Sequence, residues 1–123
     1  MASEGLHEAP DALGSATVDR HRAIRSIMEE LDAVDWYDQR VDATDDPSLA
    51  AVLAHNRDEE KEHAAMTLEW LRRHDPVLDR HLRTYLFTTE PVTEVEQEQE
   101  AAGEDDPALG GGLGIGSLKG ATL

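Results

Sequence analysis

The sequence contains no cysteine, which excludes disulfide bonds, thiolate metal sites and cysteine nucleophiles. A metal ion would therefore be held by histidine and carboxylate side chains, a donor set that favours hard or borderline cations. The sequence also lacks an apolar run long enough to cross a bilayer and a signal-peptide pattern at its start. These absences predict a cytoplasmic protein without a membrane partner.

Basic residues are scarce: 11 lysines and arginines stand against 27 acidic residues, and the net charge is −16. This charge argues against nucleic acids as partners, because binding to phosphates needs cationic contacts. It suits a protein that handles cations, although many soluble proteins are acidic for other reasons. The length of 123 residues leaves room for one small domain at most.

Apolar residues at helical spacing predict a first long helix. It should begin near Ser15 or Thr17 and run to about Asp42, after a polar arm of about a dozen residues. Its apolar positions recur at steps of three and four: Ile24, Ile27, Met28, Leu31 and Val34.

A second helix should span residues 47–74, because Asp46 is a favourable N-cap and Pro47 suits the first helical position. Asp75 precedes a proline and therefore ends this helix. A short third helix is expected over residues 77–87.

Two long helices with a short connection predict an all-α fold built on an antiparallel hairpin. Because one partner covers only part of each apolar stripe, the hairpin should also self-associate.

The composition changes after Thr89. Residues 90–112 are rich in acidic residues, glutamine, alanine and glycine, with little to bury, so we expect a disordered linker there. Residues 1–89 would then form the helical hairpin domain. A small apolar island follows the linker at residues 113–118, where glycines alternate with apolar side chains and let the backbone lie flat in a groove.

Glu30 lies on the apolar face of the first helix, since Ile27 and Val34 are within about 60° of it on a helical wheel. Burying an unpaired carboxylate costs several kcal/mol, on the order of the penalties for buried ions. This side chain should therefore be protonated, paired or bound to a metal.

Glu60 and His63 interrupt the apolar stripe of the second helix and form a Glu-x-x-His pair on one helix face. A carboxylate can bridge two metal ions and an imidazole can terminate one of them, a donor set that suits iron, manganese or zinc. The same motif is common on charged helices, so Glu60 paired with Lys61 or Arg57 of a neighbour is an open alternative.

One chain supplies half of a known ligand set. Ferritin-like di-iron bundles use a Glu from each of two helices and a Glu-x-x-His from each of the other two. This chain offers one such Glu, which is Glu30, and one Glu-x-x-His pair, which is Glu60 with His63. A two-fold dimer would complete the set, with the site between subunits.

Three segments closely resemble the encapsulated ferritins: residues 28–37 (MEELDAVDWY), 56–66 (NRDEEKEHAAM) and 69–73 (EWLRR). The resemblance covers about residues 5–90. Residues 113–120 (LGIGSLKG) resemble the targeting peptide that docks cargo into encapsulin shells, and Leu113, Ile115 and Leu118 would be its apolar anchors.

The resemblance implies a ferroxidase that forms rings of five dimers and encloses no cavity, so that the encapsulin shell stores the iron. It implies that Glu30, Glu60 and His63 bind the two iron ions, with Trp36 and Tyr37 close by.

The resemblance also implies an outer metal site at Glu29 and Asp32, on the route of the ions. The family usually has glutamate where this chain has Asp32, whose side chain is one methylene shorter.

Two other functions remain open: a peroxide-consuming di-iron or di-manganese enzyme on the same scaffold, and a non-enzymatic cargo protein in which metal only links a structural dimer.

Overall fold

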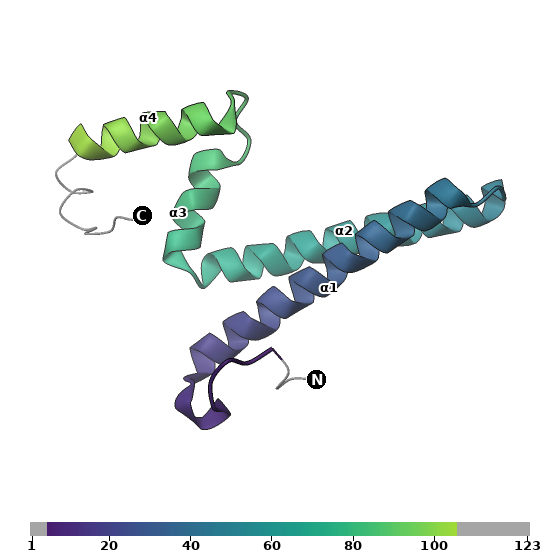
Figure 1. Cartoon of the computed structure of the whole chain (residues 1–123), viewed down its shortest axis with the longest axis horizontal. Helices are drawn as coiled ribbons and strands as arrows, with labels where there is room; N and C mark the ends of the chain where they lie inside the picture. Colours follow the sequence, from purple (N-terminus) through teal and green to yellow (C-terminus); the bar gives the residue numbers. More distant parts are fainter. Residues whose placement is uncertain (1–4, 106–123) are drawn as a thin grey trace. The chain divides into compact units, whose positions relative to one another are not determined.

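The computed structural model describes residues 5–105, and within this range every regular element is helical, which confirms the all-α class (Figure 1). The elements in chain order are η1 Pro10–Ala12, α1 Ser15–Ala43, α2 Pro47–Arg73, α3 Pro76–Tyr85 and α4 Val92–Asp105. They fall into two units that divide between His74 and Asp75.

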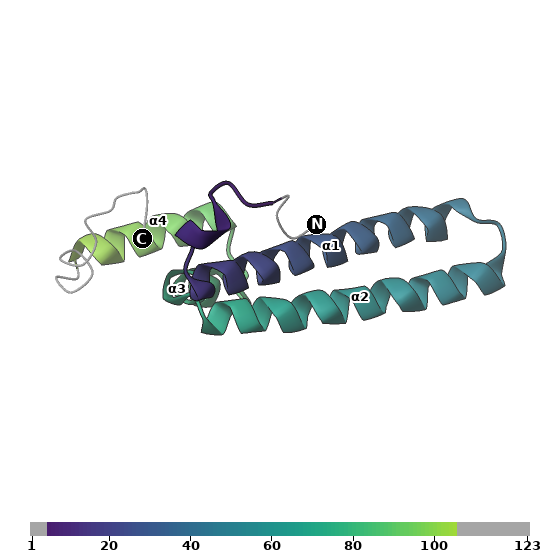
Figure 2. The same cartoon turned by 90° about the horizontal axis from the view of Figure 1, so that it is seen from below.

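The first unit is an antiparallel hairpin of α1 and α2, which pack against each other (Figure 2). The three-residue connection ends in Asp46, whose Oδ1 accepts hydrogen bonds from the backbone N–H groups of Ser48 at 2.9 Å and Leu49 at 3.4 Å. Pro47 follows as the first helical residue. The predicted start of this helix and the predicted hairpin are confirmed. The polar arm before α1 contains one short 3-10 helix that the composition did not indicate.

The end of α2 is defined by charge and by a proline. Glu69 accepts hydrogen bonds from Arg72 and Arg73, which hold the pKa of its carboxyl well below the ordinary range, at about 2. Arginines in the last turn also complement the negative end of the helix dipole. Asp75 then accepts from the N–H of Leu78 at 3.0 Å and caps α3, so the predicted break at this position is confirmed.

The second unit contains α3 and α4, and it corrects the prediction for residues 90–112. Residues 92–105 are a helix, not disordered linker. Glutamate, glutamine and alanine are good helix formers, and Val95, at 5% exposure, supplies the buried contact that the composition concealed. The first unit ends at His74, and α3 packs with α4 in the second unit.

Tyr85, the last residue of α3, is partly buried and is influenced by acidic residues of α4. Partial burial raises the pKa of Tyr85, and the carboxylates of Glu96 and Glu100 raise it further. The α3 helix stops at Tyr85, two residues before the prediction, and Phe87 adopts a left-handed backbone with φ of 65°. The remainder of the expected linker and the segment at 113–120 lie outside the described residues.

The hairpin buries little of its apolar surface by itself. Ala23, Ala64 and Leu71 are its buried apolar residues. Larger apolar side chains along both helices are exposed: Ile24, Met28, Leu31 and Trp36 on α1, and Leu49, Val52, Met66 and Trp70 on α2. No described helix combines the length and apolar character that crossing a membrane requires.

Candidate metal centre

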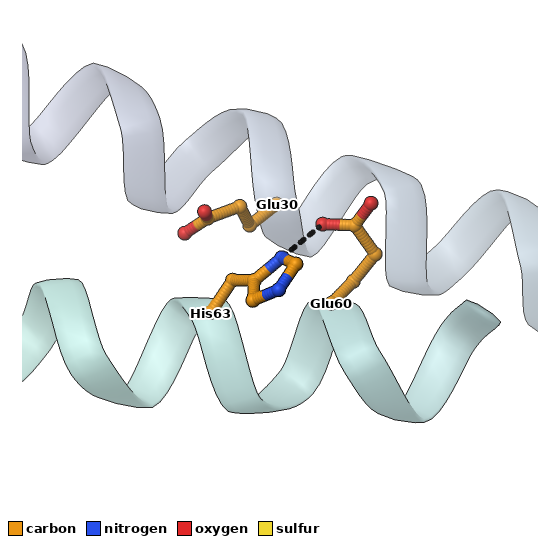
Figure 3. Close-up of side chains that lie close together, drawn as sticks. All are labelled: Glu30, Glu60 and His63. Atoms are coloured by element: carbon orange, nitrogen blue, oxygen red, sulfur yellow. Dashed lines mark ion pairs between the residues drawn. The ribbon is translucent and has the colours of Figure 1, made fainter. Parts of the chain in front are cut away.

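The middle of each long helix carries the candidate ligands. Glu30 lies near the midpoint of α1, and Glu60 and His63 lie near the midpoint of α2. Because the connection is short and the helices are antiparallel, the two midpoints face each other. Figure 3 shows Glu30 on one helix and Glu60 and His63 on the other, with the three side chains in the space between the helices.

These three residues form a compact group. Each offers one ligand atom, and the three atoms lie within 4.8 Å of one another. The Nδ1 of His63 is 3.5 Å from Oε1 of Glu60, the contact drawn as a dashed line in Figure 3. Two carboxylates and an imidazole are a ligand set that suits iron, manganese or zinc.

The oxygen Oε1 of Glu30 provides the sharpest test of whether a cation fits here. It is buried and has no hydrogen-bond partner. Leaving a buried polar atom without a partner is costly, and more so for a charged group. A cation bound by the Glu30 carboxylate would offset this cost, and Glu60 and His63 offer further donors close by, so the donor set fits a metal ion.

Exposed apolar side chains follow His63 on its face of α2, toward the C-terminal end of the helix. The side chain of His63 is 48% exposed, and Met66 and Trp70 follow at steps of three and four on the same face. Met66 is 65% exposed. A surface of this kind, with a ligand beside it, is suited to closure by another protein surface.

Within the chain, neither Arg57 nor Lys61 pairs with Glu60. Arg57 contacts Asp38 and Asp58, and Lys61 lies 3.4 Å from Asp58. The hydrogen bond from Arg57 lowers the pKa of the Asp58 carboxyl, and the pKa of Arg57 is raised by Asp58 and then by Asp38. Both cations therefore have carboxylate partners other than Glu60.

The residues expected at an outer site do not join this group. Glu29 and Asp32 are exposed, and the metal-ligand group found among the described residues contains neither. They lie three residues apart, and Trp36 follows Asp32 by four, so the three share one exposed face of α1. An outer site at these residues stays a prediction.

Tyr37 and Trp36 point to different faces of α1. Tyr37 lies seven residues after Glu30, hence on the same face, and it is half-buried. The guanidinium of Arg40 lies 5.4 Å from the centre of the Tyr37 ring. Trp36 lies about 120° around the helix from Glu30, so it is placed with Asp32 rather than with the three ligands.

The hydrogen bond between Arg57 and Asp38, which crosses from α2 to α1, was not expected from the sequence. Both residues look like ordinary surface charges in the helical pattern. The feature of the sequence that could have predicted this contact is the presence of opposite charges on the facing sides of the two helices.

The tail anchors Leu113, Ile115 and Leu118 lie beyond the part of the chain that the structure describes.

Comparison with known proteins identifies relatives over almost the whole chain. An "Encapsulated ferritin-like protein" of Rhodospirillum rubrum is 62% identical over 98% of this chain and 91% of its own length. A "Ferritin-like protein" of Thermotoga maritima is 51% identical over 94% and 99%. The "Encapsulin nanocompartment cargo protein EncC" of Myxococcus xanthus is 37% identical over 80% and 83%.

A solved structure also matches. The crystal structure of a protein from Nitrosomonas europaea superposes with a TM-score of 0.69 and 59% sequence identity, and covers 72% of this chain and 97% of that one. A family model described as EncFtn-like matches residues 5–89, which contain both long helices and all three members of the candidate metal centre. The chain therefore belongs to the EncFtn-like family, the encapsulated ferritins.

Proposed function

We propose that this protein is a ferroxidase, which oxidises Fe(II) to Fe(III) at a di-iron site shared by two copies of the chain. The observation that carries the proposal is the buried, unpartnered Oε1 of Glu30 in one group with Glu60 and His63. A cation bound there would offset the cost of burying this carboxylate without a hydrogen-bond partner.

Two copies are required because one chain supplies three ligands. A two-fold axis beside the group doubles it to four carboxylates and two imidazoles, the ligand set of ferritin-like di-iron bundles. The exposed apolar side chains beside His63, chiefly Met66 and Trp70, supply surface for such a dimer. The paired hairpins then make a four-helix bundle.

The charges of the ligands suit the substrate better than the product. Four carboxylates balance the charge of two Fe(II) ions, whereas two Fe(III) ions carry two further positive charges that these side chains do not offset. An uncompensated charge in a partly buried site is unfavourable, and this favours release of the oxidised product. Each Fe(II) gives up one electron, and dioxygen or peroxide takes up the pair.

The exposed acids Glu29 and Asp32 have a supporting role in this proposal. Negative side chains near an opening raise the local concentration of cations and so speed their arrival. Trp36 shares their face of α1, and Tyr37 shares the face of Glu30.

We further propose that the protein is cargo of an encapsulin shell. Relatives at 62% and 37% identity are named as an encapsulated protein and as an encapsulin cargo protein. In this proposal residues 113–120 dock in the shell, the dimers form a ring of five, and the shell stores the oxidised iron. The protein would then act in the cytoplasm, inside the shell.

The test is iron oxidation by the purified full-length chain. Fe(II) added without oxygen should bind at two ions per dimer, and oxygen or peroxide should then give Fe(III) faster than in buffer. Glu60→Ala should abolish both, and Glu62→Ala, an exposed acid two residues away, should abolish neither. A crystal soaked with Fe(II) should show anomalous scattering beside Glu30, Glu60 and His63.

Two results would refute the proposal. Full oxidation by Glu60→Ala would exclude the shared site. Zinc, which has no redox chemistry, supporting every activity of the protein would instead favour a structural role for the metal.

A further inference from the structure

An ion pair joins the two long helices. Arg57 on α2 donates from Nη1 to Oδ1 of Asp38 on α1 at 2.9 Å. Its Nε donates to Oδ1 of Asp58 at 3.0 Å, and Lys61 lies 3.4 Å from that same oxygen. The guanidinium is thus held by carboxylates of both helices, and its side chain is 22% exposed.

This pair lies close to the candidate metal centre along the hairpin. Arg57 precedes Glu60 by three residues, less than one turn of α2. Asp38 follows Glu30 by eight residues, which is roughly 12 Å along α1. The positive charge of Arg57 is offset by two carboxylates, so it does not oppose a cation at the centre.

The centre needs a precise register between the helices. Glu30 belongs to α1, whereas Glu60 and His63 belong to α2. Their three ligand atoms therefore lie within 4.8 Å of one another only in one register of the two helices. A slip of one residue moves a side chain by about 1.5 Å along the axis and turns it by about 100°. The short connection brings the two midpoints together, but small buried residues such as Ala23 and Ala64 interlock weakly and add little to the final alignment.

We propose that Arg57 and Asp38 are positioning residues, whose ion pair sets the register of α1 against α2 so that Glu30 meets Glu60 and His63 before metal binds. This inference rests on the proposed function, because it assigns the pair a role at the same site. It predicts that the two residues act on metal binding without touching the metal.

The first experiment uses Co(II) as a redox-stable probe and the full-length protein without iron. Asp38→Asn and Arg57→Gln should each raise the Co(II) dissociation constant by about two- to fivefold, the range expected for a partly exposed ion pair. Each should also change the visible Co(II) spectrum, which reports ligand geometry. The double variant should be no weaker than Arg57→Gln alone, because that change already removes the contact with Asp38.

Three controls accompany it. Asp38→Glu retains the charge and should restore most of the affinity. Asp19→Asn removes a carboxylate that pairs with Arg22 within one turn of α1, at 2.7 Å, and should change neither affinity nor spectrum. Far-ultraviolet circular dichroism should show equal helix content in all variants.

A second experiment needs no metal. Because the chain has no cysteine, spin labels can be attached at Asp35→Cys on α1 and Glu62→Cys on α2, in protein diluted with unlabelled copies. The distance distribution between labels should be narrow in the otherwise native chain and broader when Asp38→Asn is added.

An equally narrow distribution of the distance between the spin labels in Asp38→Asn would overturn this inference, regardless of the result for Co(II) binding. Additive losses in the double variant, with an unchanged Co(II) spectrum, would overturn it as well, because they would indicate general destabilisation. Failure of the unaltered chain to bind Co(II) or Fe(II) would instead refute the proposed function.

Discussion

Glu30 is a residue whose burial is unfavourable for the fold, and in the proposed metal centre it is a ligand. Its Oε1 is buried without a partner, while the other carboxylate of the group, Glu60, has His63 beside it. Natural proteins keep such groups where function needs them, and the remaining packing tolerates the cost.

We therefore predict opposite effects of Glu30→Met on stability and on iron. The thioether chain has a similar volume and no charge to bury, so the metal-free protein should gain about 1 kcal/mol in free energy of unfolding. Binding of Fe(II) should be lost. Urea denaturation and anaerobic Fe(II) titration measure the two effects, and a clear loss of metal-free stability would contradict the account of Glu30.

Glu29 and Asp32 should affect the rate of iron oxidation and not the number of iron ions that the dimer binds. Because both are exposed and outside the three-residue group, alanine at either should slow iron oxidation severalfold and leave two ions bound per dimer. Stopped-flow absorbance and equilibrium titration separate the two quantities, and high salt should shrink the difference. Asp32→Glu should match or exceed the original rate. Loss of bound iron would show that these residues are direct ligands.

At the scale of elements, α4 depends on a single buried side chain. Val95 is 5% exposed, and among the side chains of α4 that the structure describes it is the only buried one. Burial of a valine contributes roughly 1.5–3 kcal/mol. Like-charged pairs four residues apart, such as Glu96 with Glu100, act against the helix.

Val95→Ser should therefore detach α4 from α3. We expect faster hydrogen exchange over residues 92–105, measured by mass spectrometry, and unchanged exchange in α1 and α2. The matched control is Val92→Ser, since that side chain is already 63% exposed. Equal protection in Val95→Ser would mean that α4 is held by contacts other than this one.

At the scale of the whole molecule, the hairpin exposes the surface that its proposed partner would cover. Met66→Glu should place a charge on the apolar face that carries His63 and weaken dimerisation by about one to two orders of magnitude, from the lost burial of one side chain. Iron oxidation should fall with it, while helix content stays. Sedimentation tests this, with Glu62→Ala as control. A monomer that oxidises iron at the full rate would exclude the shared site.

The tail should separate targeting from chemistry. Deleting residues 108–123 removes Leu113, Ile115 and Leu118 and leaves every described helix intact. The truncated protein should assemble and oxidise iron normally but remain outside encapsulin shells when the two are produced together. Attaching the same residues to an unrelated soluble protein should carry that protein into the shell. Normal loading of the truncated protein would place the signal elsewhere.

The sequence alone determined the features that depend on local spacing. The helical period located α1 and α2 to within a residue or two, and Asp46 and Asp75 marked where helices begin and end. The same period placed Glu30, Glu60 and His63 on the apolar stripes of their helices, because neighbours at three and four residues define a face before any packing is known.

Only the tertiary structure decided what depends on distances between helices. That the three ligand atoms lie within 4.8 Å, and that Arg57 reaches Asp38, follows from the register of the hairpin, which the helical period leaves free. The burial of Val95 in the helix of residues 92–105 is likewise a tertiary feature, whereas the composition of this segment taken alone resembles a linker. Periodicity is a property of one element, while register and burial are properties of two elements in contact.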